Sequence, residues 1–223
     1  MKLPSAVIFF FIVAGIEIII QAAGLLQFDG FIKPLIVPWL VLWYLRQSTS
    51  KDTVFVLALL FCWAGDVLLL LAGKQELFFI GGLGSFLVAH VLLIRTYQKL
   101  RHEGEGLNGP QRARAAFPVL LAATGLVVVL YPRLGDLKLP VIVYALILAV
   151  MVCQSFFRYG FTSPASFWSV SGGAFLFMLS DSLLALNKFY APLPLAGVWV
   201  MSTYMAAVFF IVRGVIRHPQ PTT

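Results

Sequence analysis

The chain has 223 residues, of which 61% are hydrophobic and only 11% are charged, and its mean hydropathy is +0.95. Because so few polar residues cannot coat a water-soluble globule, the composition excludes that class and predicts an integral membrane protein. The net charge of +7 does not indicate nucleic-acid binding, since the basic residues lie in short connections between apolar runs.

Eight apolar segments in chain order predict eight transmembrane helices, because each approaches the roughly 20 residues that cross the hydrocarbon core. The first contains Glu17 and is not followed by a cleavage site and a soluble domain, so we expect a retained helix and not a removed signal peptide. The sequence predicts an all-α, polytopic membrane bundle that forms one domain over residues 1–223. The expected helices span residues 5–26, 32–46, 53–72, 77–97, 114–131, 139–158, 165–186 and 194–215.

The second segment is the weakest of the eight, because it is short and contains Pro34 and Pro38. Pro34 suits the first turn of a helix. If this helix were absent, seven helices would remain and the termini would lie on opposite sides of the membrane. Three aromatic residues are expected to anchor it at the interface: Trp39, Trp43 and Tyr44.

Basic residues divide unevenly between the two sides of an eight-helix bundle. The side with both termini holds 11 of the 16 Lys and Arg residues, so the positive-inside rule predicts that both termini are cytoplasmic. The connection from Gln98 to about Ala113 is charged and glycine-rich, which predicts a flexible cytoplasmic loop. The opposite side holds Lys33, Lys74, Arg133, Lys138 and Lys188.

Two aspartates interrupt apolar runs at matching places, Asp66 after Gly65 and Asp181 after Ser180. A charge inside the bilayer costs about 2.5 to 3.5 kcal/mol on insertion scales, so such residues normally face a wet cavity and act in transport or chemistry. Both helices cross in the same direction, which predicts one depth for the two carboxylates, about 9 Å inside the non-cytoplasmic end. A purely structural role and a parallel internal duplication both remain open.

Two further helices contain polar residues. Glu17, Gln21 and Gly24 form a stripe on one helix face that is expected to turn inward, as support for a site or as structure. His90 follows a small-residue face along which another helix can approach, so packing and function are both open for it.

Lys33 and Lys188 are predicted at the non-cytoplasmic end, toward which both aspartates are displaced. They would pair with the aspartates or hold an anionic headgroup, while the alternative is snorkelling to the interface. Pro34 fixes the backbone beside Lys33, which favours a functional role. The other candidates for the same pocket are Tyr144, Asn187 and Tyr204.

Familiar catalytic motifs are absent from the sequence. Catalytic zinc takes three protein ligands, and only His90 of the three histidines lies in an apolar run, so no metal site is predicted. Residues 82–86 and 169–173 miss the G-x-S-x-G elbow, and no P-loop or dinucleotide fingerprint occurs. Cys62 and Cys153 lie in apolar runs and are expected to be buried thiols.

Taken in order, four stretches resemble the YhhN family, which includes the animal TMEM86 lysoplasmalogenases: residues 33–35, 65–69, 81–90 and 172–185. The resemblance implies hydrolysis of the vinyl ether of a lysoplasmalogen, a lysophospholipid, to a fatty aldehyde and a glycerophospho-headgroup. The expected location is a bacterial inner membrane, with membrane lipids as neighbours. One position departs from the family, because Met205 to Val208 follow Tyr204 where members often carry a glutamine.

The implied reaction suits two aspartates. A vinyl ether is hydrolysed by protonation of its β-carbon and capture of the oxocarbenium ion by water, a problem that glycosidases solve with two carboxylates. Burial and mutual repulsion favour one protonated and one ionised carboxyl group, and which aspartate is the acid stays open. No metal or organic cofactor is needed. The alternatives are a small proton- or ion-coupled transporter, a lipid-handling protein and a structural scaffold.

The resulting site prediction has three parts. Asp66 and Asp181 are the catalytic residues. The substrate-binding residues are Lys33, His90, Tyr144, Asn187, Lys188 and Tyr204. The supporting residues are Glu17, Gly65 and Ser180.

Overall fold

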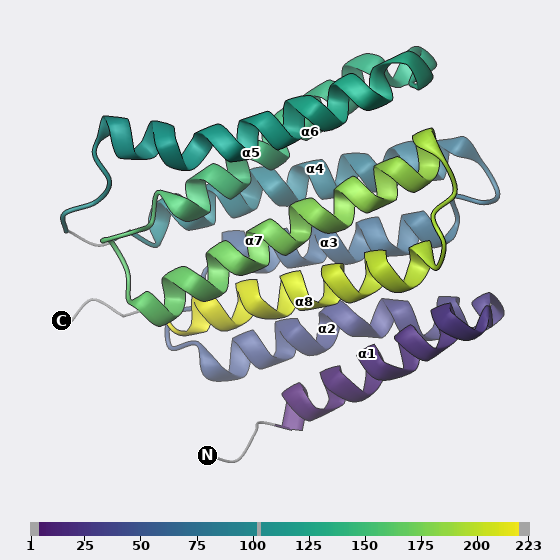
Figure 1. Ribbon diagram of the computed structural model, residues 1–223. Coiled ribbons are helices and arrows are strands. Elements are labelled where there is room, and N and C mark those ends of the chain that lie inside the picture. The colour runs from purple at the N-terminus through teal and green to yellow at the C-terminus, as the bar shows by residue number, and fades with distance from the viewer. Residues whose placement is uncertain (1–4, 102–103, 219–223) are drawn as a thin grey trace.

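A computed structural model describes residues 5–101 and 104–218, and within those ranges the chain forms long helices and no strand (Figure 1). Eight of the helical segments are long and apolar enough to cross a membrane. The predicted all-α bundle of eight membrane helices is therefore confirmed, while the side that the termini face stays a prediction from charge. The long helices are α1 Ser5–Ala23, α2 Asp29–Gln47, α3 Thr53–Leu70, α4 Glu76–Lys99, α5 Gly109–Leu130, α6 Lys138–Phe156, α7 Pro164–Ala185 and α8 Ala196–Ile216.

Two helical hairpins, α3–α4 and α7–α8, form the centre of the bundle. The α1–α2 pair packs on α8 and α3, and the α5–α6 pair packs on α4 and α7 (Figure 1). Both described chain ends lie at one end of the bundle. We call the other end the distal end, and it is formed by the turns at residues 24–28, 71–75, 131–137 and 186–195.

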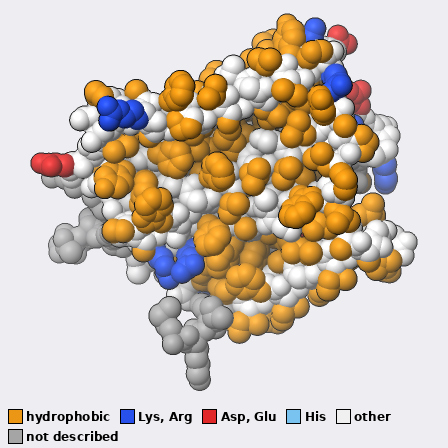
Figure 2. Space-filling view, viewed as in Figure 1, with side chains coloured by type: hydrophobic (Ala, Val, Ile, Leu, Met, Phe, Trp, Pro, Cys, Tyr) orange, Lys and Arg blue, Asp and Glu red, His pale blue; other side chains and the backbone are white. Residues whose placement is uncertain are grey.

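The outer surface has the character expected of a protein in lipid. Figure 2 shows hydrophobic side chains over the middle of the visible face and charged side chains near the ends of the helices. The α5 helix is the least buried of the eight spans, and its outer face carries large exposed apolar residues. A helix satisfies its own backbone hydrogen bonds, so such a surface is stable in the bilayer.

The second helix forms despite its two prolines, but its start differs from the prediction. It begins at Asp29, so Pro34 lies inside the helix and not in its first turn. Because Pro38 has no N–H, the Pro34 carbonyl lacks its usual donor within the helix. The indole nitrogen of Trp63 in α3 donates to that carbonyl over 2.9 Å. This hydrogen bond ties α2 to α3 one residue from Lys33.

Two of the aromatic residues in α2 are buried, so the expectation of interfacial anchoring is wrong for them. Trp43 is 8% exposed and Tyr44 is 1% exposed. The Tyr44 hydroxyl accepts a hydrogen bond from the Asp52 amide at 2.9 Å, which fixes the turn before α3. Cys62 and Cys153 are free and buried, as predicted.

The connection between α4 and α5 is shorter than the predicted 98–113 loop. Asn108 and Gln111 form a reciprocal capping box, which starts α5 at Gly109. Side chains capable of such a box stabilise helix starts because they satisfy free backbone N–H groups. The Arg158 guanidinium donates to the Leu100 carbonyl over 3.4 Å, so the beginning of this connection is held against the α6–α7 turn.

Helices α7 and α8 approach each other closely at one glycine. A Cβ atom on Gly173 would lie 2.7 Å from the Ala207 carbonyl oxygen and 2.9 Å from the Ile211 amide nitrogen. Both of these are backbone atoms that cannot rotate away. A Cβ atom on the neighbouring Gly172 would meet nothing within 4 Å.

We therefore expect Gly173→Ala to destabilise the bundle, because overpacking of this kind costs about 1 to 3 kcal/mol. Gly172→Ala is the matched control and is expected to be neutral or slightly stabilising, since alanine favours helix more than glycine does. Thermal unfolding of the purified variants in detergent measures the difference. Equal midpoints for the two variants would contradict the close approach.

Candidate active site

Asp66 of α3 and Asp181 of α7 line the same cavity near the distal end, which has a volume of about 300 Å³. The Asp66 residue is 2% exposed and the Asp181 side chain is 11% exposed. Both helices end earlier than predicted, at Leu70 and Ala185, yet each aspartate still lies four residues before its helix end. The matching positions in the two helices therefore bring two buried carboxyl groups to one chamber, which we call the polar cavity.

The polar cavity collects most of the predicted site residues. Lys33 reaches it from the first half of α2, and Lys188 reaches it from the short helical turn Leu186–Tyr190 that follows α7. In the described part of the chain, neither lysine forms an ion pair within 4.0 Å. Two cations beside a cavity suit an anionic ligand. The predicted residues in its lining are Lys33, Asp66, Ser180, Asp181, Asn187, Lys188 and Tyr204.

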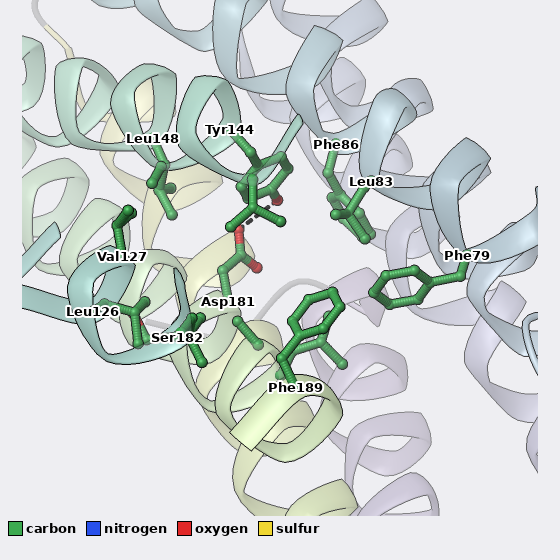
Figure 3. Close-up of a pocket in the computed structure, with 15 residues that line it drawn as sticks. Phe79, Leu83, Phe86, Leu126, Val127, Tyr144, Leu148, Asp181, Ser182 and Phe189 are labelled. Carbon is green, nitrogen blue, oxygen red and sulfur yellow. Dashed lines mark hydrogen bonds between the residues drawn. The ribbon is translucent and has the colours of Figure 1, made fainter. Parts of the chain in front are cut away.

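Each aspartate accepts a hydrogen bond from a tyrosine on a different helix. The Tyr204 hydroxyl in α8 donates to Asp66 Oδ2 over 2.7 Å. The Tyr144 hydroxyl in α6 donates to Asp181 Oδ2 over 2.6 Å, as Figure 3 shows. A carboxyl group in a membrane interior needs such partners because water is scarce there. The two bonds fix the direction in which each carboxyl group points.

His90 lies behind Asp181 and outside the lining of the polar cavity. It is fully buried, its Nε2 is 3.8 Å from Asp181 Oδ2, and its ring packs edge to face on Phe177. This arrangement lets His90 act on Asp181 but not on a ligand in the polar cavity. Among the described residues, no three His, Cys, Asp or Glu side chains form a group that could hold a metal ion.

Three of the other predicted residues shape the walls of the polar cavity. A Cβ atom on Gly65 would lie 2.6 Å from the Phe86 ring, so this glycine lets α4 approach Asp66 closely. The Ser180 hydroxyl donates to the Val200 carbonyl over 3.0 Å, and Asn187 Oδ1 accepts from the Leu193 amide at 2.9 Å. Both bonds connect α7 or its extension to the segment that enters α8.

Glu17 is fully buried in α1, where it accepts a hydrogen bond of 3.0 Å from Gln21, and it does not line the polar cavity. The polar stripe on α1 therefore turns inward at Glu17. Gly24, the third residue of that stripe, is exposed and ends the helix with a φ of +69°.

A second cavity, formed by apolar side chains of α4 to α7, also reaches Asp181 (Figure 3). We call it the apolar cavity. Asp181, Phe79, Phe86 and Leu184 line both cavities, whereas Asp66 lines only the polar one. The two chambers are therefore neighbours, and among the described residues Asp181 is the one ionisable residue that lines both.

The apolar cavity continues into a groove of about 310 Å³ between α4 and α6, and Phe79, Leu83, Val141 and Tyr144 line both. Exposed apolar residues, among them Leu139, surround the mouth of this groove. Sequence reasoning missed both features. In a chain that is 61% hydrophobic, residues that line a hollow carry the same pattern as residues that face lipid.

Comparison with known proteins adds a family and named relatives. The profile of the YhhN family matches residues 28–215. The human lysoplasmalogenase TMEM86B is 30% identical over 82% of this chain and 72% of its own length, and human TMEM86A is 27% identical over 84% and 77%. A lysoplasmalogenase of Mycobacterium tuberculosis is 32% identical over 61% of this chain and half of its own length. No solved structure matches the chain.

Removing the tyrosine that holds Asp66 is expected to destabilise the fold. Tyr204→Phe leaves a buried carboxyl group without its donor, a loss of about 1 to 3 kcal/mol. The matched control is Tyr97→Phe in α4, because the Tyr97 hydroxyl is buried without a hydrogen-bond partner among the described residues. Thermal unfolding in detergent should show a lower midpoint for Tyr204→Phe only, and equal midpoints would argue against the Tyr204–Asp66 bond.

Proposed function

This chain belongs to the YhhN family, and from that membership and the geometry of its polar cavity we propose that it is a lysoplasmalogenase. In this proposal it hydrolyses the vinyl ether of a lysoplasmalogen to a fatty aldehyde and a glycerophospho-headgroup. Relatives named lysoplasmalogenase at about 30% identity support the reaction. The observation that carries the mechanism is that Asp66 and Asp181 line one cavity.

The two lysines of the polar cavity would bind the phosphate of the substrate. Lys33 and Lys188 lie at the distal end, where a headgroup at the membrane surface can reach them. Ammonium groups form strong, charge-assisted hydrogen bonds with phosphate oxygens. The Lys188 Nζ lies 4.9 Å from the centre of the Phe79 ring, and both residues line the polar cavity. The headgroup would therefore be held near the two aspartates.

The chemistry needs one carboxylic acid and one carboxylate. The acid delivers a proton to the β-carbon of the vinyl ether, and the resulting oxocarbenium ion is stabilised by the neighbouring carboxylate, which also takes a proton from the attacking water. The reaction requires water and these two groups, and none of its steps requires a metal or an organic cofactor. The hydrogen bonds from Tyr144 and Tyr204 would hold both carboxyl groups in position.

Replacing either aspartate by asparagine should abolish turnover. Purified protein in detergent is expected to release aldehyde from a lysoplasmalogen but not from its saturated ether analogue, and Asp66→Asn or Asp181→Asn should lower the rate by about 100-fold or more. Asp136→Asn is the control, because Asp136 is an exposed aspartate at the distal end. Aldehyde release is measured by coupling to an aldehyde-oxidising enzyme.

Two results would contradict the proposal. One is a folded wild-type protein that releases no aldehyde. The other is proton- or ion-coupled uptake in proteoliposomes without any aldehyde, which would assign the two aspartates to transport instead.

The phosphate site has its own test. Lys33→Ala should raise the KM for a lysoplasmalogen about tenfold, which corresponds to roughly 1.4 kcal/mol of lost binding. Lys74→Ala is the matched control, since Lys74 is exposed at the same end and does not line the polar cavity. With a 1-alkenylglycerol that lacks phosphate, the two variants should behave alike. A tenfold effect that persists on this substrate would show that Lys33 acts on something other than phosphate.

A further inference from the structure

Asp181 lines both the polar and the apolar cavity, so a lipid with its headgroup in the first and its chain in the second would bind in one orientation. That orientation assigns different catalytic roles to the two aspartates. We propose that Asp181 is the acid that protonates the alkenyl carbon and that Asp66 is the base that activates water. This assignment rests on the proposed function and goes beyond it, because the paired carboxylates alone leave the roles interchangeable.

The first step is the position of the hydrocarbon chain. A phosphate belongs in the polar cavity with Lys33 and Lys188, because burial of an unpaired charge among apolar side chains is costly. The chain then extends past Asp181 into the apolar cavity and on to the groove between α4 and α6. That groove ends among exposed residues of the membrane-facing surface, so the chain stays in an apolar environment along its length.

The second step is the order of atoms in the substrate. In the group glycerol–O–CH=CH–R, the carbon that accepts the proton is bonded to the chain, and the carbon that water attacks is bonded to oxygen. With the headgroup in the polar cavity, the proton-accepting carbon lies on the side of the apolar cavity. Asp181 lines both cavities and Asp66 lines only the polar one. Asp181 is thus placed for the carbon next to the chain, and Asp66 for the carbon next to oxygen.

The hydrogen bonds of the two aspartates do not decide between them. Each accepts one from a tyrosine, over 2.6 Å for Asp181 and 2.7 Å for Asp66. Of the two aspartates, His90 lies near Asp181 alone, and the distance of 3.8 Å from its Nε2 to Asp181 Oδ2 is too long for a hydrogen bond. The different cavities are therefore the feature that separates the roles.

The complete cycle balances with these two groups and one water. Asp181 gives its proton to the chain-side carbon as the C=C electrons form the new C–H bond, which leaves an oxocarbenium ion. Water adds to the oxygen-bearing carbon and passes a proton to Asp66, giving a hemiacetal. Asp66 then protonates the glycerol oxygen while Asp181 takes the hemiacetal hydroxyl proton, and the C–O bond breaks. Aldehyde and free glycerol hydroxyl leave, and both aspartates return to their starting states.

Deuterium exchange separates the two roles. In D₂O the wild type should release aldehyde with one deuterium on the carbon next to the carbonyl. In Asp66→Asn, protonation by Asp181 can still occur and reverse, so recovered substrate should gain deuterium on its chain-side vinyl carbon while aldehyde release falls about 100-fold or more. In Asp181→Asn, neither aldehyde nor exchange is expected. Mass spectrometry of the recovered lipid and of the aldehyde measures both.

The outcomes are distinct. Exchange in Asp66→Asn alone supports the assignment; exchange in Asp181→Asn, or in neither variant, overturns it. A wild type that releases no aldehyde overturns the proposed function instead. Each variant must elute as a single species and unfold cooperatively in detergent, and where Asp66→Asn does not, Asp66→Ser takes its place.

Discussion

The placement of two carboxyl groups inside an apolar bundle, near its distal end, is the constraint on which the rest of this structure depends. Each carboxyl group needs a donor from a neighbouring helix, and Tyr204 and Tyr144 supply them. These bonds link α8 to α3 and α6 to α7. The helices that provide the site are therefore also the helices whose relative positions the site requires.

The two central hairpins exchange partners. His90 in α4 follows Asp66 in α3 by 24 positions, and Tyr204 in α8 follows Asp181 in α7 by 23. Yet Tyr204 bonds Asp66 and His90 touches Asp181, so the second helix of each hairpin serves the aspartate of the other. This reciprocity is the geometry that a parallel duplication of one hairpin would produce. The two contacts differ in kind, because Tyr204 donates a hydrogen bond to Asp66 whereas His90 lies 3.8 Å from Asp181.

Hydropathy predicted the eight helices because bilayer thickness sets helix length, and the aspartates and Lys33 stood out because a charge in an apolar run is costly. Tyr144 and Tyr204 were predicted as substrate-binding residues, but their pairing with the aspartates was not. Tyr204 bonds Asp66 across 138 positions of chain, and a sequence does not say which helices adjoin. Pro34 was placed in a first turn because the start of α2 at Asp29 carries no strong signal. The apolar cavity was not predicted, because in a chain that is 61% hydrophobic the residues that line it look like residues that face lipid.

Phe79 lies at the boundary between the polar cavity and the apolar cavity. Its side chain lines the polar cavity, the apolar cavity and the groove. Lys188 lies 4.9 Å from its ring centre, and the Phe189 ring packs on it edge to face at 5.9 Å. One aromatic ring thus meets a cation that lines the polar cavity and a hydrophobic neighbour that lines the apolar cavity. Exposed apolar residues line the groove, so a hydrocarbon chain bound there would stay against apolar side chains and lipid and would need no closed tunnel through the protein.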